Sequence, residues 1–223
     1  MNRVITILLF LIFFSSSCSM FPGASTKSTV DDLVQILYAS DPDSKYYIDN
    51  SSEFAEFSHA LEQLSDMGTG AIDAASMIAK AISFPRRDSY MAAEALLSLG
   101  PDIASTTIPI LLDNLNSQRS EVRAYSTFVL ASIGGPASCA VAEISHLLWD
   151  TDMFVRAAAA IALDNITGVD LVEEYYKFIP EEHVNLSMPG DDPEGSITNY
   201  ARIWWEETGS NINWHPDYGL CDP

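Results

Sequence analysis

The residues that could carry out chemistry are few, and their spacing matches no local catalytic motif. The chain has four histidines, His59, His146, His183 and His215, and no two of them lie four residues apart. The metalloprotease zinc motif needs two histidines at that spacing on one helix, so this kind of site is not expected. The sequence also has no glycine-rich phosphate loop and no Gly-x-Ser-x-Gly nucleophile elbow. We therefore expect no catalysis, no cofactor and no metal.

A cluster of oxygen-bearing side chains near the C-terminus is the one weak candidate for a cation site. Residues 191–194 read Asp-Asp-Pro-Glu, with Asn185 and Ser187 a few positions earlier. Such oxygens could bind calcium, but their order does not match the calcium loop of an EF-hand. A solvated loop is the interpretation that we favour.

The N-terminus has the pattern of an export signal. After the single positive charge of Arg3, residues 4–14 are all apolar. This stretch is too short to span a membrane, which takes about 20 residues, and it is typical of the apolar region of a signal peptide. Three serines then lead into Cys18.

The serines and Cys18 resemble the lipobox of bacterial lipoproteins, in which cleavage precedes a cysteine that becomes lipidated. The resemblance implies an exported protein at the cell envelope, held to the membrane through Cys18 on its periplasmic or extracellular side. The sequence departs from the motif at Ser15, where leucine is usual, so simple cleavage before Cys18 or an uncleaved anchor are the alternatives. We expect a signal peptide over residues 1–17. Residues 18–27, which lack a hydrophobic period, would form a flexible tether.

The charge of the chain limits the classes of partner that are expected. It has 31 acids and 11 bases, a formal net charge of −20. Such a surface repels phosphate groups, so nucleic acid is not an expected partner, whereas a basic protein is. The alternative is that the acidity only maintains solubility.

The middle of the chain repeats with a helical period. Val-Arg-Ala occurs at 122–124 and again at 155–157, so Arg123 and Arg156 lie 33 residues apart. Three stretches share apolar positions at i, i+4, i+7, i+8 and i+11, which form one face of a helix. These stretches are Val155, Ala159, Ala162, Leu163 and Ile166; Val122, Ser126, Val129, Leu130 and Ile133; and Asp88, Ala92, Ala95, Leu96 and Leu99.

Each of these helices follows another predicted amphipathic helix. The preceding stripes are Met77, Ile78 and Ile82; Ile108, Leu111, Leu112 and Leu115; and Val141, Ile144, Leu147 and Leu148. Ser120 and Thr151 are good N-cap residues for the second helices of their pairs. A helix pair of this length cannot bury its own apolar faces, so the pairs are expected to stack.

The Val-Arg pairs, the alanine-rich second helices and the Ile-Gly ending at 133–134 resemble HEAT-like repeats of the phycobilisome-lyase type. The resemblance covers residues 68–168 and implies an all-α fold, an α-solenoid of about three to four helical hairpins with helical end caps. Residues 28–67 would be an N-terminal cap or a degenerate repeat. The first unit departs from the pattern, because it has Asp88-Ser89 where Val-Arg is expected.

The resemblance also bears on the site residues. It implies that Arg123 and Arg156 form a structural ladder with acids in the turns, for which Asp150 and Asp152 are the candidates. Some HEAT-like proteins are di-iron hydroxylases with repeated His-Glu dipeptides, and this sequence has none. Pigment attachment is cytoplasmic and conflicts with an export signal. We expect a scaffold that binds other proteins and is not an enzyme; an enzyme accessory or a lyase-like, cofactor-binding protein is the alternative.

Residues 169–223 are acidic and rich in aromatic residues. The segment carries twelve acids and two bases, and helices are predicted over 169–178 and 196–208. Because the last repeat of a solenoid exposes an apolar face, Trp204, Trp205 and Trp214 are expected to form a C-terminal cap. An aromatic platform for a sugar or a peptide is the alternative.

Two cysteines remain if Cys18 is lipidated. In an oxidising compartment Cys139 and Cys221 could form a disulfide that holds the tail against the last repeat. A buried, free Cys139 and an unpaired Cys221 are the alternative, and the spacing leaves both open.

Overall fold

The computed structural model describes residues 28–41, 52–85, 88–171 and 197–214, and the elements within these ranges are all helices, with no strand among them. This confirms the predicted all-α class. Within the same ranges, no helix combines the length and the apolar character that crossing a bilayer requires.

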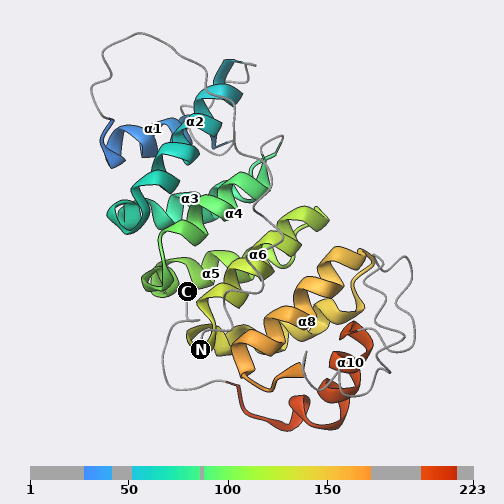
Figure 1. Cartoon of the computed structure of the whole chain (residues 1–223). Coiled ribbons are helices and arrows are strands. Elements are labelled where there is room, and N and C mark those ends of the chain that lie inside the picture. The colour runs from blue at the N-terminus through green and yellow to red at the C-terminus, as the bar shows by residue number, and fades with distance from the viewer. Residues whose placement is uncertain (1–27, 42–51, 86–87, 172–196, 215–223) are drawn as a thin grey trace, which may run out of the picture.

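The helices follow one another along the molecule, from α1 and α2 at one end to α8 and α10 at the other (Figure 1). The α-helices are α1 (Val30–Ser40), α2 (Ser52–Met67), α3 (Ala75–Ala81), α4 (Ser89–Ser98), α5 (Ala104–Asn114), α6 (Ser120–Ile133), α7 (Val141–His146), α8 (Met153–Thr167) and α10 (Ile197–Glu207). Short 3-10 helices connect or extend them: η3 (Gly68–Ala74), η4 (Pro101–Ile103), η5 (Gly135–Ala140), η6 (Leu147–Trp149) and η8 (Gly209–Asn211).

Alternate helices pack against each other in succession. Helix α2 contacts α4, α4 contacts α6, α6 contacts α8 and α8 contacts α10. The intervening helices lie beside this row: α3 contacts α4 and α5, α5 contacts α6, and α7 contacts α8. Helices α4 and α6 therefore bury their apolar stripes between the helix that precedes them and the neighbouring helices of the row.

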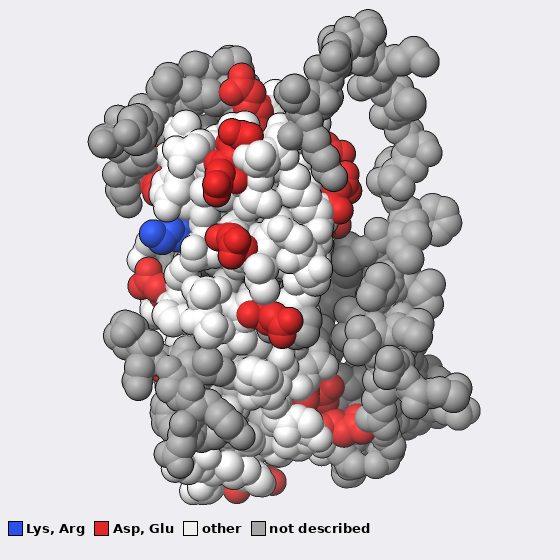
Figure 2. Space-filling view, turned by 90° about the vertical axis from the view of Figure 1, so that its left-hand side faces the viewer, with Lys and Arg blue, Asp and Glu red and all other residues white. Residues whose placement is uncertain are grey.

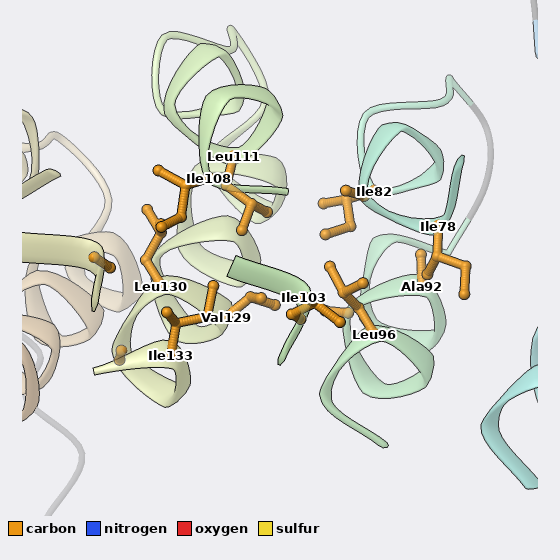
Figure 3. Close-up of a cluster of buried hydrophobic side chains, with 14 of the residues drawn as sticks. Ile78, Ile82, Ala92, Leu96, Ile103, Ile108, Leu111, Val129, Leu130 and Ile133 are labelled. Carbon is orange, nitrogen blue, oxygen red and sulfur yellow. The ribbon is translucent and has the colours of Figure 1, made fainter. Parts of the chain in front are cut away.

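The repeated stripe is buried, as its period predicts. On the second helices of the second and third units, every stripe position, including Ser126, is at most 6% exposed. Figure 3 shows how Ile82 and Leu96, from the first pair, face Ile103 and the side chains of α5 and α6. Ile108 and Leu111 of α5 and Leu130 of α6 are each 0% exposed, so the interior between pairs is one continuous apolar core.

Asp88 is the exception in the predicted stripe. It is exposed and serves as the N-cap of α4, where its Oδ1 accepts hydrogen bonds from the backbone N–H groups of Tyr90 and Met91. A carboxylate at this position satisfies amides that the helix cannot satisfy itself, and burying it would remove it from water. The stripe of the first unit therefore begins at Ala92.

The predicted N-caps of α6 and α8 are each wrong by one residue. Ser120 is the first helical residue of α6, and Arg119 occupies the cap without a side-chain hydrogen bond. At α8 the cap is Asp152, not Thr151, and its Oδ1 accepts from the N–H of Phe154 at 2.8 Å. Both residue types at 151 and 152 are good caps, so local propensity alone does not choose between them.

The elements at the two ends agree in part with the sequence. Helix α2 has fully buried Phe57 and Leu64, and α1 begins after Thr29, which forms a capping box with Asp32. Helix α10 lies within the predicted 196–208. The helix predicted over 169–178 falls largely outside the described residues.

Candidate functional site

An ion pair joins α6 to the turn before α8. The guanidinium of Arg123 donates to both carboxylate oxygens of Asp150, with Nε–Oδ2 and Nη2–Oδ1 distances of 2.7 Å. The side chains are 14% and 8% exposed. Two parallel hydrogen bonds between charged groups in a largely dry environment fix distance and orientation together, so the pair sets how the third unit sits on the second.

The predicted ladder has a second, repeated contact. Arg123 Nη1 donates to the carbonyl of Ser117 at 2.7 Å, and Arg156 Nη1 donates to the carbonyl of Asp150 at 2.9 Å. In both units the acceptor lies six residues before the arginine. The structure thus brings Arg123, Arg156 and Asp150 together in one network.

Asp152 has a different place from the one expected. Its side chain caps α8, and its backbone N–H donates to Asp150 Oδ1 at 2.9 Å. It therefore holds the turn in shape while Asp150 makes the contact between units.

The surroundings of Asp150 lower its pKa. Burial alone would raise the pKa of this carboxyl, but the hydrogen bonds from Arg123 and from the N–H of Asp152, with the charges of Arg123 and Arg156, outweigh burial. The net result is a pKa below the ordinary 3.8. The same pairing raises the pKa of Arg123, so the ion pair is fully charged at neutral pH.

Two further arginines make structural contacts that the sequence did not reveal. Arg119 donates to the carbonyl of Phe84 and to Ser89 Oγ, at 2.8 and 3.2 Å, and pairs with Glu121. Arg202 on α10 donates to the carbonyl of Leu148, and its guanidinium lies 5.8 Å from the ring centre of Trp149. Backbone carbonyls carry no sequence signal, so only the packing of distant segments shows these contacts.

The surface that remains is acidic. Among the described residues, Lys80 is the one lysine or arginine that is exposed, because the four arginines are partly buried in these contacts. Exposed acids run along the described chain: Asp31, Asp32, Glu56, Glu62, Asp66, Asp73, Asp88, Glu94, Asp102, Asp113, Glu121, Glu143, Glu206 and Glu207. Figure 2 shows acidic side chains scattered among neutral residues along one face of the molecule.

A hollow of about 160 Å³ lies where α6 and α8 begin. We call it the aromatic hollow; it is lined by Ser120, Glu121, Ala124, Tyr125, Phe128, Asp152 and Phe154. Phe128 and Phe154 are 37% and 54% exposed, which is unusual for phenylalanine. The ring of Tyr125 packs against that of Tyr90, with centroids 5.7 Å apart. The residues that line the aromatic hollow come from two units. The repeat period of the sequence therefore did not predict the hollow.

The C-terminal tryptophans pack on one another and on the core. Trp204, Trp205 and Trp214 are half-buried against it, and the ring centre of Trp204 lies 6.2 and 6.1 Å from those of the other two. Trp214 Nε1 donates to the carbonyl of Gly209 at 2.8 Å. A Cβ at Gly209 would lie 2.7 Å from the ring of Trp205, so only glycine leaves room for this cluster. This packing is what a cap requires.

The remaining candidates are placed only in part. Cys139 is buried and disulfide-bonded, but the cysteine bonded to it lies outside the described residues, so pairing with Cys221 stays a prediction. Cys18 and the acidic cluster at 191–194 are outside as well. The described part of the chain contains no group of three or more histidines, cysteines or acids placed to hold a metal ion.

Comparison of the chain with protein-family models, with curated proteins and with solved structures finds no match.

The lowered pKa of Asp150 predicts how stability depends on pH. A carboxyl with a depressed folded-state pKa adds stability above its unfolded value, and this stability is lost as the pH falls through the folded value. Replacing Asp150→Asn should therefore lower the free energy of unfolding by about 2–3 kcal/mol near pH 7. The difference from the wild type should shrink near pH 2. Urea unfolding at both pH values measures it.

Asp73→Asn is the matched control for this measurement. It removes the same charge from an exposed position in η3 and should change stability by less than about 0.5 kcal/mol. An Asp150→Asn variant as stable as this control, or a loss equal at both pH values, would contradict the structural role of the ion pair.

The tryptophan cluster predicts a stability role for Trp204. Replacing Trp204→Ala should cost about 2 kcal/mol, less than a fully buried tryptophan because the ring is only half-buried. Ile203→Ala is the control on the same helix, since Ile203 is 45% exposed. Thermal unfolding checks both. Equal melting temperatures, with loss of a bound sugar or peptide in Trp204→Ala alone, would support the aromatic platform instead.

Proposed function

We propose that this protein is an exported HEAT-like α-solenoid, tethered to the membrane of the cell envelope through Cys18, that binds a basic partner protein and catalyses no reaction itself. Three features support the solenoid. The apolar stripe recurs with the repeat period, alternate helices contact one another in succession, and an arginine six residues after a turn carbonyl recurs at Arg123 and Arg156. Stacked helix pairs of this kind present an extended surface and depend on partners for their function.

The observation that carries the proposal is the separation of charges. The four described arginines donate to carbonyls, to a serine or to acids within the fold, while acids are exposed along the whole described chain. A surface of this kind attracts cationic proteins and speeds their association. Affinity must come from apolar anchors, and exposed Leu97, Phe128 and Phe154 supply them on α4, α6 and α8. We therefore assign the partner to the face formed by these three helices.

The tether is tested by replacing Cys18→Ala. A lipid on this cysteine would hold the mature chain at the membrane, so the variant should appear in the soluble fraction or stay uncleaved. Ser19→Ala is the control and should still sediment with membranes. If the Cys18→Ala variant is processed and sediments as the wild type does, the tether lies elsewhere.

The partner is tested by crosslinking in intact cells, followed by kinetics with the captured protein. An acidic surface that steers a basic partner should lose that effect as salt shortens the screening length to about 3 Å at 1 M. We expect the association rate to fall by at least about tenfold between low salt and 1 M salt. A rate that does not respond to salt, or a captured partner as acidic as this chain, would show that the charge serves solubility alone.

A further inference from the structure

The aromatic hollow combines an apolar wall with an acidic rim. Ala124 forms part of its lining and is 6% exposed, while the rings of Tyr125, Phe128 and Phe154 surround it. Glu121 and Asp152 contribute carboxylates from the first turn of α6 and from the cap of α8. Exposed aromatic rings grouped in a hollow mark a surface that a partner covers.

Among the described residues near the hollow, carboxylates outnumber the guanidinium groups whose charges act on them. Glu121 is paired with Arg119, whose two remaining nitrogens donate toward Phe84 and Ser89, across to the preceding unit. Burial raises the pKa of the Tyr125 phenol, and the charge of Asp88 raises it further. Glu121 and Asp152 thus line the hollow, and the charge of Asp88 acts on Tyr125. Against these three carboxylates stand two guanidinium groups, those of Arg119 and Arg123.

The two helix N-termini at the hollow do not reverse this balance. The positive end of a helix dipole favours anions, with a typical strength of about 0.3–1 kcal/mol. Here both ends are already occupied: Asp152 Oδ1 accepts from the N–H of Phe154, and the carboxylate of Glu121 accepts from its own backbone N–H. The hollow therefore favours a cation with a flat or apolar body.

We propose that the aromatic hollow binds an arginine side chain of the partner, with its guanidinium against the rings of Phe128, Phe154 and Tyr125 and its N–H groups directed at Asp152 and Glu121. Guanidinium is flat, weakly hydrated and always charged, so it stacks on rings and reaches a carboxylate at the same time. The methylene stem would cover the exposed edge of Phe154. This inference rests on the proposed function, which supplies the basic partner.

The test uses the full mature chain and a synthetic peptide, acetyl-Gly-Ser-Leu-Arg-Leu-Ser-Gly-amide. Its analogue with citrulline in place of arginine has nearly the same shape and no charge. Titration followed by NMR should show the arginine peptide binding with a dissociation constant near about 1 mM, as expected for one anchored side chain. The citrulline peptide should bind at least about tenfold more weakly. The resonances of Tyr125, Phe128 and Phe154 should shift most.

Two variants locate the binding. Phe154→Ala removes a ring that is 54% exposed, so it should leave the fold intact and weaken the arginine peptide by about tenfold. Asp152→Asn keeps a good N-cap for α8 but removes the charge, and should weaken binding about threefold. Ile203→Ala, at an exposed position on α10 that does not line the hollow, is the control and should bind as the wild type does.

Three outcomes would overturn the inference: equal binding of the two peptides, equal effects of Phe154→Ala and Ile203→Ala, or shifts spread over the acidic surface without preference for the hollow. These outcomes are distinct from failure of the proposed function. If the crosslinked partner is basic and its association is salt-sensitive, the proposed function holds even when the arginine peptide does not bind in the hollow.

Discussion

The bidentate contact between Arg123 and Asp150 is the interaction on which the described architecture depends. It joins helices of two units, and the same carboxylate orders its own turn by accepting from the N–H of Asp152. That turn places the start of α8 beside the start of α6. The aromatic hollow takes its lining from both starts. The contact between the units therefore lies beside the candidate binding surface.

The contacts that hold the units together also decide the character of the surface. A composition of 31 acids and 11 bases is already acidic, and the described arginines are withdrawn into the fold, where they bind carbonyls and acids. If the same acids and bases were all exposed and scattered over the surface, local positive patches would remain. Among the described residues, the arginines serve the interior contacts and most of the acids are exposed, which is why a cationic partner is the chemistry that we propose.

The sequence predicted what its period encodes. A stripe of spacing 4, 3, 1 and 3 marks one face of a helix, so the burial of Leu130 and Leu163 followed from it. Prediction from the sequence failed where the contact that determines the structure joins segments that are distant in the chain. Arg119 and Arg202 bind backbone carbonyls 35 and 54 residues away, and a carbonyl looks the same in every residue. The N-caps were missed by one position because neighbouring residues were equally capable. The aromatic hollow is formed by residues of two units, so no single stretch of the sequence predicts it.

The contacts between neighbouring units differ in strength, and this difference sets the order in which the units should unfold. At the junction of α6 with α8, a charged pair with two hydrogen bonds ties the helices. At the junction of α4 with α6, Ser89 occupies the position equivalent to Arg123. Hydrogen bonds from Arg119 to Ser89 Oγ and to the carbonyl of Phe84, at 3.2 and 2.8 Å, replace the ion pair. In the solenoid that we propose, stability would be the sum of the contacts between neighbouring units, and the weaker junction would be the first to separate in a partly unfolded form. Backbone amide hydrogens in α6 and α8 should then exchange more slowly than those in α2 and α4. Helices α6 and α8 would be the last cooperative block to unfold.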